Sequence, residues 1–158
     1  MHAWNEPYKR PCGWIRIAIK VLDKYPDGNA WLGTDGWRSY SVGGEWPVSY
    51  HGTSMSNVKA IIETHYIAGS RQLYGRGIYS TCDINEAAAN YSIKVTCKET
   101  RKIYDVLLQN RINPKMRKVC TRKDYWLIEI PEGTPPDKEG EIVEKSIRPY
   151  GILFKELK

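Results

Sequence analysis

The sequence predicts an α+β fold. Its second half contains three segments rich in β-branched and aromatic residues, bounded by turn-forming residues: 103–109, 124–130 and 147–157. The helical patterns are short and lack the regular strand and helix alternation of parallel α/β proteins. The 158 residues contain no repeat and no clear linker. We therefore expect a single domain over residues 1–158, with 1–45 as an N-terminal strand and loops that lead into the core.

Composition excludes several classes of protein. Hydrophobic residues make up 41% and charged residues 27%, as in soluble globular domains, and no apolar run could span a bilayer. The first residues lack the apolar core of a secretory signal, so we expect the cytoplasm or the nucleus. The cysteines form no C-x-x-C pair, so we interpret them as free thiols and expect no metal site. They are Cys12, Cys82, Cys97 and Cys120.

The first predicted element is a strand in WIRIAIKVL, because apolar and polar residues alternate there. Its expected core face carries Ile15, Ile17, Ile19 and Val21, and its outer face Arg16 and Lys20. The following KYPDGNAWLGTDGW is rich in glycine and predicts turns. VSYHG then predicts a short strand that ends at Gly52.

A first short helix should follow that strand. Ser54 or Ser56 can cap it, its apolar spacing extends from Val58 to Tyr66, and Gly69 would end it. His65 falls near the apolar face of this helix, and we interpret it as a packed histidine.

A second helix is predicted by Asp83 as N-cap with Glu86 at position N3, an Asp variant of the capping box, before the Ala-rich AAANYS. Tyr91 follows Ala87 and Ala88 by one turn, so its ring should stand over small side chains. Near the C-terminus, Pro149 predicts that the last strand is an edge strand or starts late.

Glycine and aromatic residues gather around two positions, His51 in YHGTS and Tyr79 in YGRGIYS. Gly52 and the GRG of residues 75–77 would let a ligand approach the backbone. Tyr79 and Tyr91 could face each other as a clamp for an aromatic ring.

The motifs YHGT, YGRGIYST and AAANYS, in this order, resemble the catalytic domain of the poly(ADP-ribose) polymerase type of ADP-ribosyltransferase, the diphtheria-toxin-like His-Tyr-Glu class. The resemblance covers residues 48–91. It implies two mainly antiparallel sheets that form a cleft for NAD, with short flanking helices. The family's Glu at the start of a late strand corresponds to Asp124 in KDYWLIEI, which is one methylene shorter. A misplacement of that size can cost on the order of a hundredfold in rate.

The resemblance also implies roles. Asp124 would stabilise the oxocarbenium-like sugar that forms as nicotinamide leaves, since charge grows there in the transition state. His51 would bind a hydroxyl of the adenosine ribose with support from Thr53, and the backbone of Gly52 would bind the carboxamide. Tyr91 would stack on nicotinamide, and Tyr79 would close the other side.

Further ligand contacts are expected near these residues. Ala88 stands where the family has a Ser that bonds the carboxamide, so Ser80 or Ser92 would have to replace it. Gly77 lies in the motif next to Tyr79. The loop arginines Arg71 and Arg76 could contact phosphates or could be solvated.

Other carboxylates compete with Asp124 for the catalytic role. Glu129 should lie on the opposite strand face, and Glu132 lies in a Pro/Gly turn. We expect Asp105 and Glu99 to be surface charges.

We therefore expect an enzyme, a monomer with an open NAD cleft, that transfers single ADP-ribose units to a protein or nucleic acid. The charge of +6, concentrated between Lys94 and Lys123, is a solvated face or a contact for DNA or RNA. Two alternatives stay open. One is an RNA 2′-phosphotransferase that consumes NAD, against which Tyr79 and Tyr91 argue. The other is a binding module for NAD or ADP-ribose without turnover.

Overall fold

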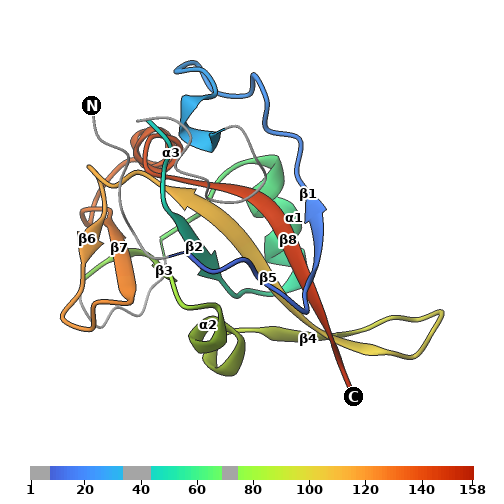
Figure 1. Ribbon diagram of the computed structural model, residues 1–158. Helices are drawn as coiled ribbons and strands as arrows, with labels where there is room; N and C mark the ends of the chain where they lie inside the picture. The colour runs from blue at the N-terminus through green and yellow to red at the C-terminus, as the bar shows by residue number, and fades with distance from the viewer. Residues whose placement is uncertain (1–7, 34–43, 69–74) are drawn as a thin grey trace.

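The computed structural model describes residues 8–33, 44–68 and 75–158 (Figure 1). In these residues, eight antiparallel strands form one sheet around which three α-helices pack, which confirms the α+β class. The strands are β1 (Ile15–Ala18), β2 (Val48–His51), β3 (Gly77–Thr81), β4 (Ile93–Thr96), β5 (Ile103–Ile112), β6 (Lys118–Val119), β7 (Tyr125–Glu129) and β8 (Ile147–Leu157). The helices are α1 (Met55–Glu63), α2 (Ile84–Asn90), α3 (Pro136–Glu144) and the short 3₁₀ helix η1 (Ala30–Leu32).

The described strands form one hydrogen-bonded sheet, so the expectation of two sheets was wrong. The order is β1-β8-β5-β2-β3-β7-β6, and β4 pairs with β5 beside β2. The two halves of this sheet meet at β2 and β3, which share a single residue pair, Tyr50 with Thr81. In Figure 1, β6 and β7 are steeply inclined to β5 and β8. The sheet is therefore continuous but narrow at its centre.

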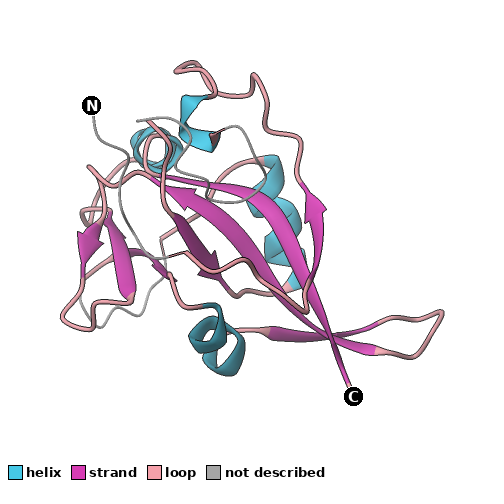
Figure 2. Cartoon of the chain, in the orientation of Figure 1, coloured by secondary structure: helices cyan, strands magenta, loops and turns pink. Residues whose placement is uncertain are grey.

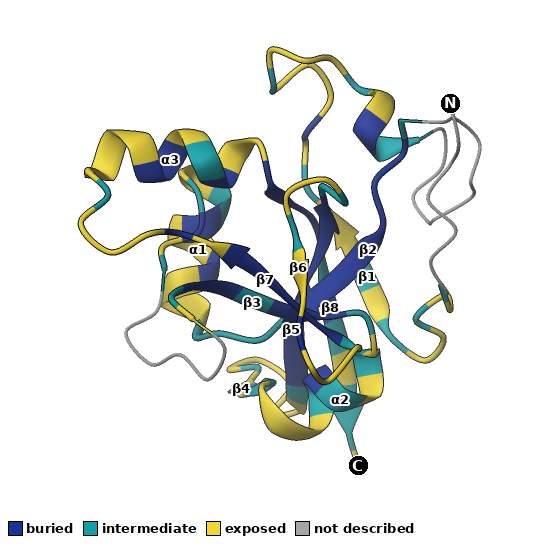
Figure 3. Cartoon of the chain, turned by 90° about the vertical axis from the view of Figure 1, so that its left-hand side faces the viewer, coloured by how far each residue is buried: buried dark blue, intermediate teal, exposed yellow. Residues whose placement is uncertain are grey.

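Two cores lie on opposite faces of the sheet. Helices α1 and α3 contribute Val58, Ile61 and Val143 to one core, together with residues of β5, β7 and β8. The other core joins η1, the segment before β2, and α2 to the sheet. Figure 3 shows the buried strands between α1 and α3 on one side and α2 with the N-terminal segment on the other.

Strand β1 is confirmed, but the predicted buried face is wrong at Ile15 and Ile17, whereas Val21 is buried and Ile19 packs against the core, as predicted. Ile15 and Ile17 are 60% and 52% exposed. Arg16 points inward instead, where Nε donates to Gln109 Oε1 at 2.8 Å and Nη2 donates to the Tyr150 carbonyl at 3.0 Å. Because a buried amide and carbonyl need partners, the arginine takes the inner face.

Helix α1 starts as predicted and ends earlier. The Ser54 hydroxyl accepts the backbone N–H of Asn57 at 3.3 Å, so Ser54 and not Ser56 is the N-cap. The helix ends at Glu63, and Tyr66 is buried in the segment after it. Gly69, the predicted helix end, lies outside the described residues.

Helix α3 was not predicted, because two prolines and a glycine obscured it. Pro136 occupies its first position, where the missing N–H is not needed. Gly140 allows close packing, since a Cβ there would lie 2.9 Å from His65 Nε2. His65 is therefore a packed histidine, as predicted, and its Nδ1 donates to the Tyr66 carbonyl at 2.7 Å.

The three late strands are confirmed, and β4 and β6 were not predicted. Figure 2 shows the hairpin of β4 and β5 projecting from the body of the protein. Strand β8 is not an edge strand, because it lies between β1 and β5. Pro149 is tolerated there because it faces the register shift at Gln109 and Asn110, and because β1 pairs only with Gly151 to Phe154.

Candidate functional site

His51 lies at the narrow centre of the sheet, at the end of β2. Its Nδ1 is 2.7 Å from the carbonyl oxygen of Tyr79 on β3, and its ring meets that of Tyr66 edge-on at 5.0 Å. A carbonyl only accepts, so Nδ1 carries a proton and, in the neutral ring, Nε2 is the acceptor. Burial lowers the pKa of His51, and the bond to Tyr79 opposes this effect in part. The neutral ring is therefore favoured.

Gly52 and Thr53 follow His51 and are half-buried. A Cβ on Gly52 would lie 1.9 Å from the carbonyl oxygen of Tyr91, so this glycine permits the end of α2 to approach β2. The sequence prediction gave Gly52 a different purpose, the approach of a ligand. The Thr53 hydroxyl accepts a hydrogen bond from Asn57 Nδ2 at 3.1 Å.

The two predicted clamp residues have a common neighbour in Tyr125. Tyr79 is half-buried, donates its hydroxyl to the Gly75 carbonyl and packs against Tyr125, Leu127 and Cys120. Tyr91 ends α2 and is 49% exposed, and its ring meets Tyr125 edge-on at 6.0 Å. An exposed aromatic face beside other rings is suited to stacking on a planar ligand.

Asp124 precedes β7 and belongs to a charged network that the sequence did not predict. Its Oδ1 accepts from Arg122 Nε at 3.1 Å, and Arg122 Nη2 contacts Glu86 Oε2 at 2.9 Å. The hydroxyl of Tyr125 donates to Glu86 Oε1 at 2.6 Å. The guanidinium of Arg122 also lies over the Tyr125 ring, 5.0 Å from its centre. Asp124 is thus connected to Tyr91 through Arg122, Glu86 and Tyr125.

The protonation of this network follows from its contacts. The hydrogen bond from Tyr125, followed by the contact with Arg122, lowers the pKa of Glu86. The bond to Glu86 raises the pKa of Arg122. Burial, and then the hydrogen bond to Glu86, raise the pKa of the Tyr125 phenol. At neutral pH, Glu86 is therefore anionic and Tyr125 is a neutral donor.

The serines expected to replace the family's carboxamide ligand differ in availability. Ser92 Oγ lies 2.6 Å from the Ala88 carbonyl oxygen and 3.1 Å from Asp105 Oδ1, so its single proton is already engaged by these two acceptors. Ser80 is 4% exposed, and its hydroxyl has no hydrogen-bond partner among the described residues. Asp105 is not the surface charge we expected, because it is 8% exposed and also contacts Lys94.

Arg76 and Gly77 have structural contacts. Arg76 Nη1 donates to the carbonyls of Ile130 and Pro131 at 3.0 and 3.3 Å, and Nη2 lies 3.5 Å from Glu139 Oε2. A Cβ on Gly77 would lie 1.9 Å from the Ile128 carbonyl, so this glycine allows β3 and β7 to pack closely. Arg71 lies outside the described residues.

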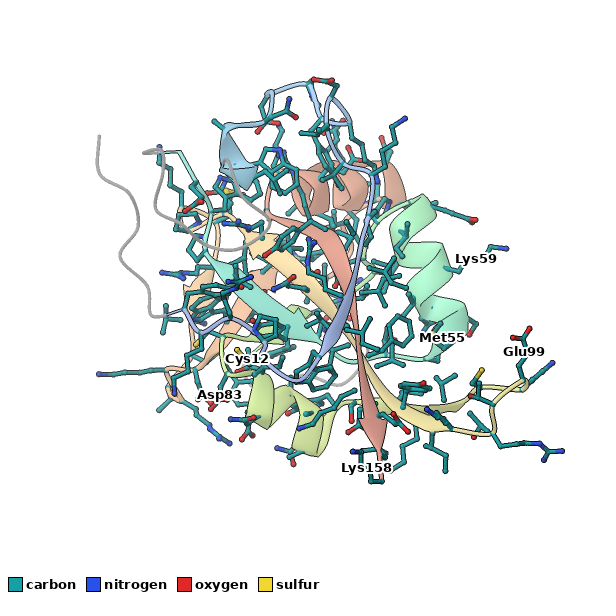
Figure 4. All side chains as sticks on the ribbon, turned by 45° about the vertical axis from the view of Figure 1, so that its right-hand side comes forward. Cys12, Met55, Lys59, Asp83, Glu99 and Lys158 are labelled. Atoms are coloured by element: carbon teal, nitrogen blue, oxygen red, sulfur yellow. The ribbon has the colours of Figure 1, made fainter. Side chains whose placement is uncertain are left out.

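The remaining carboxylates stand apart from this network. Glu129 is exposed and paired with Lys118 at 3.1 Å, and Glu132 is exposed. Glu99 is exposed at the tip of the projecting hairpin, where Figure 4 labels it far from Asp83 at the start of α2.

The basic segment between Lys94 and Lys123 is partly neutralised. Lys94 pairs with Asp105, Lys102 with Glu156 and Lys118 with Glu129. Contact with DNA or RNA therefore stays a prediction.

All four cysteines are free thiols, as predicted. Within residues 8–33, 44–68 and 75–158, no three His, Cys, Asp or Glu side chains come together as a metal site would require. No helix in the same ranges has the length and apolar character needed to cross a bilayer.

Four of the predicted site residues in the described ranges, His51, Gly52, Tyr79 and Tyr91, form one connected set. His51 bonds to Tyr79, and Tyr79 packs against the apolar cluster that contains Tyr125. The Tyr125 ring meets that of Tyr91, and the Tyr91 carbonyl covers Gly52. Glu86, Arg122 and Tyr125 were missed. Glu86 had been interpreted only as a helix cap, and no local pattern indicates that it contacts a strand 39 residues later.

No model of a known protein family matches the chain, and no curated protein matches it.

Proposed function

We propose that the protein is an ADP-ribosyltransferase that cleaves NAD and transfers single ADP-ribose units to a protein or nucleic-acid acceptor. The observation that carries this proposal is the connected set of His51, Gly52, Tyr79, Tyr91 and Asp124, which come from four separate sequence segments. Candidate residues from distant parts of the sequence indicate a functional site when the fold brings them into one small region. The proposed adenosine contact is His51 Nε2, because Nδ1 is engaged by Tyr79.

In this proposal each side chain acts on a different part of NAD. The exposed ring of Tyr91 stacks on nicotinamide, and the buried Ser80 hydroxyl is the candidate for the carboxamide. As the bond between nicotinamide and ribose breaks, positive charge grows on the sugar. Asp124 stabilises that charge with its carboxylate, since fixed charges aimed at the transition state give the largest electrostatic gain.

One observation favours a second function, a binding module without turnover. The carboxylate of Asp124 already contacts Arg122, and a paired carboxylate stabilises a sugar cation less well than a free one. The module would bind NAD or ADP-ribose through His51 and the tyrosines and release no nicotinamide.

The test measures three quantities on the same protein: nicotinamide release, transfer of label from adenine-labelled NAD to cell-extract acceptors, and the melting temperature with NAD. We expect all three to respond, and Asp124→Asn to reduce nicotinamide release on the order of a hundredfold. The matched control is Glu129→Gln, since Glu129 is an exposed carboxylate at the end of β7, paired with Lys118.

The outcomes separate the two functions. A melting temperature raised by NAD without nicotinamide release would establish the binding module. If NAD neither raised the melting temperature nor released nicotinamide, both proposed functions would be refuted. Equal activity of the wild type and Asp124→Asn would remove Asp124 from its role.

A further inference from the structure

Glu86 does not make the contact that its sequence motif predicts. In a capping box, the N3 carboxylate bonds back to the backbone N–H of the N-cap. Here the backbone N–H of Asp83 donates to Thr81 Oγ1 at 3.1 Å, and the Asp83 side chain caps α2 alone. The carboxylate of Glu86 is thereby free to leave the helix end and reach toward β7.

Glu86 connects α2 to the start of β7 by two charged or strong hydrogen bonds. Oε1 accepts from Tyr125 at 2.6 Å and from Asn90 Nδ2 at 2.8 Å, and Oε2 contacts Arg122 at 2.9 Å. The side chain is 17% exposed. Tyr91 ends α2 and Asp124 precedes β7, so Glu86 lies between the two elements that carry these proposed site residues.

Arg122 is shared between two carboxylates. Its Nε faces Asp124 Oδ1 at 3.1 Å and its Nη2 faces Glu86 Oε2 at 2.9 Å. Asp124 therefore accepts one N–H of the guanidinium and does not form a bidentate pair with it. Its Oδ2 has no hydrogen-bond partner among the described residues. Two negative charges for one positive charge leave the group with a net charge of about −1 at neutral pH.

Removing the Glu86 carboxylate would leave Arg122 with Asp124 as its only carboxylate partner among the described residues. The Arg122 side chain is 54% exposed and can rotate, and a guanidinium with a single carboxylate neighbour favours two parallel N–H bonds to it. Both oxygens of Asp124 would then be occupied and its charge matched by Arg122.

We propose that Glu86 is a positioning residue of the ADP-ribosyl transfer site: by sharing Arg122 with Asp124, it keeps one carboxylate oxygen of Asp124 free to face the ribose. It also holds Tyr125 against Tyr91. This inference rests on the function proposed above, and it adds a residue that acts through Asp124 and does not touch the substrate.

The test compares kcat and KM for nicotinamide release in the wild type, Glu86→Gln, Arg122→Gln and the double variant. Glu86→Gln keeps an oxygen for Tyr125 and removes the charge that holds Arg122. We expect kcat to fall about tenfold to a hundredfold, because the catalytic carboxylate is now covered, with KM for NAD little changed. Adding Arg122→Gln should restore most of the lost kcat, since no guanidinium remains to cover Asp124.

Rescue separates the proposal from two other roles of Glu86. If Glu86 were itself the carboxylate that stabilises the sugar, the double variant would be as inactive as Glu86→Gln. If Glu86 served only to hold the fold together, the double variant would be less stable and no more active, which thermal unfolding of all four proteins measures. Either result would overturn the proposal.

The exposed pair of Lys118 and Glu129 provides the matched control. Glu129→Gln and Lys118→Gln, alone and together, remove an ion pair of similar length outside the connected set, and they should leave kcat unchanged. A wild type that binds NAD but releases no nicotinamide would refute the proposed transferase and this inference with it. An active wild type whose Glu86→Gln variant is equally active would refute the inference alone.

Discussion

At the scale of single residues, His51 serves the fold as well as the proposed site. Its ring bonds to the Tyr79 carbonyl at the point where β2 and β3 separate, so it supplies a bond where the strand ladder stops. The same bond selects the tautomer, which leaves Nε2 as the acceptor. A structural role and a ligand-binding role are therefore compatible in this histidine.

The burial of His51 makes stability dependent on pH. Its pKa is lowered in the folded protein, so below about pH 6.5 the unfolded chain binds a proton that the folded chain does not. The free energy of unfolding should therefore decrease as the pH falls below about 6.5, by at most about 1.4 kcal/mol per pH unit, until the folded state is protonated too.

Urea denaturation of the wild type and His51→Gln between pH 8 and pH 5 measures this effect, with that range chosen to bracket the unperturbed histidine pKa of about 6.5. The difference in unfolding free energy between the two proteins should be constant at the alkaline end and shrink toward the acidic end. A difference that is the same at every pH would show that His51 titrates normally.

Some residues of the candidate site could be identified from the sequence, and others could not. His51, Tyr79 and Tyr91 could be selected because the motifs are local. For Gly52 the structure adds a reason that the sequence did not indicate, since the Tyr91 backbone occupies the space of its missing Cβ, and the approach of a ligand to its backbone stays a prediction. Glu86 and Arg122 could not be selected, because their importance depends on a contact between α2 and the start of β7.

At the scale of elements, β1 shows what an alternating pattern does and does not determine. The period of two correctly predicted a strand, but the buried face depends on what the neighbouring strand offers. Beside β1, the buried Gln109 and the Tyr150 carbonyl require a donor, and Arg16 supplies it. Ile15 and Ile17 are consequently exposed on this edge strand.

Helix α3 is held by a buried carboxylate that links three elements. Glu139 is 8% exposed; its Oε1 accepts the backbone N–H of Ala68 at 3.0 Å, and its Oε2 lies 3.5 Å from Arg76. Glu139→Ala would leave the Ala68 N–H and the Arg76 guanidinium without this partner. We expect a loss of about 1–3 kcal/mol in unfolding free energy, as for other buried donors left unsatisfied.

Glu141 on the same helix is the matched control for this prediction. It pairs with Lys138 at 3.5 Å, and both side chains are more than half exposed at 58% and 62%. Glu141→Ala should change the unfolding free energy by less than about 0.5 kcal/mol. Equal effects of the two substitutions in chemical denaturation would mean that Glu139 does not fasten α3.

At the scale of the whole molecule, the sheet and the N-terminal segment are joined by two buried arginines. Arg111 Nη1 and Nη2 donate to the carbonyls of Trp46 and Leu32 at 2.7 and 3.0 Å. Arg148 donates to the Glu144 carbonyl at 2.6 Å and pairs with Asp27 at 3.1 Å. Strands β5, β7 and β8 were predictable from residue type. The bonds of Arg111 to Trp46 and Leu32 and of Arg148 to Asp27 were not, because they join residues 65 to 121 positions apart.

The environment of Arg148 should make it sensitive even to a substitution that keeps its charge. Its side chain is 3% exposed, and its guanidinium lies 4.0, 4.4 and 5.1 Å from the ring centres of Tyr25, Trp46 and Trp31. A planar guanidinium can stack on these rings while it donates to Glu144 and Asp27, whereas a lysine ammonium cannot do both. We expect Arg148→Lys to lower the unfolding free energy by about 1–3 kcal/mol and to weaken the near-ultraviolet circular dichroism of the tryptophans.

Arg101→Lys is the control, since Arg101 is an exposed residue in the turn between β4 and β5. It should leave both the melting temperature and the spectrum unchanged. If Arg148→Lys behaved in the same way, the attachment of Tyr25, Trp31 and Trp46 to the sheet would depend on apolar packing of the rings and not on the arginine among them. If only the spectrum changed, the rings would reorient around the lysine without loss of stability, and the predicted energetic contribution of the guanidinium would be wrong.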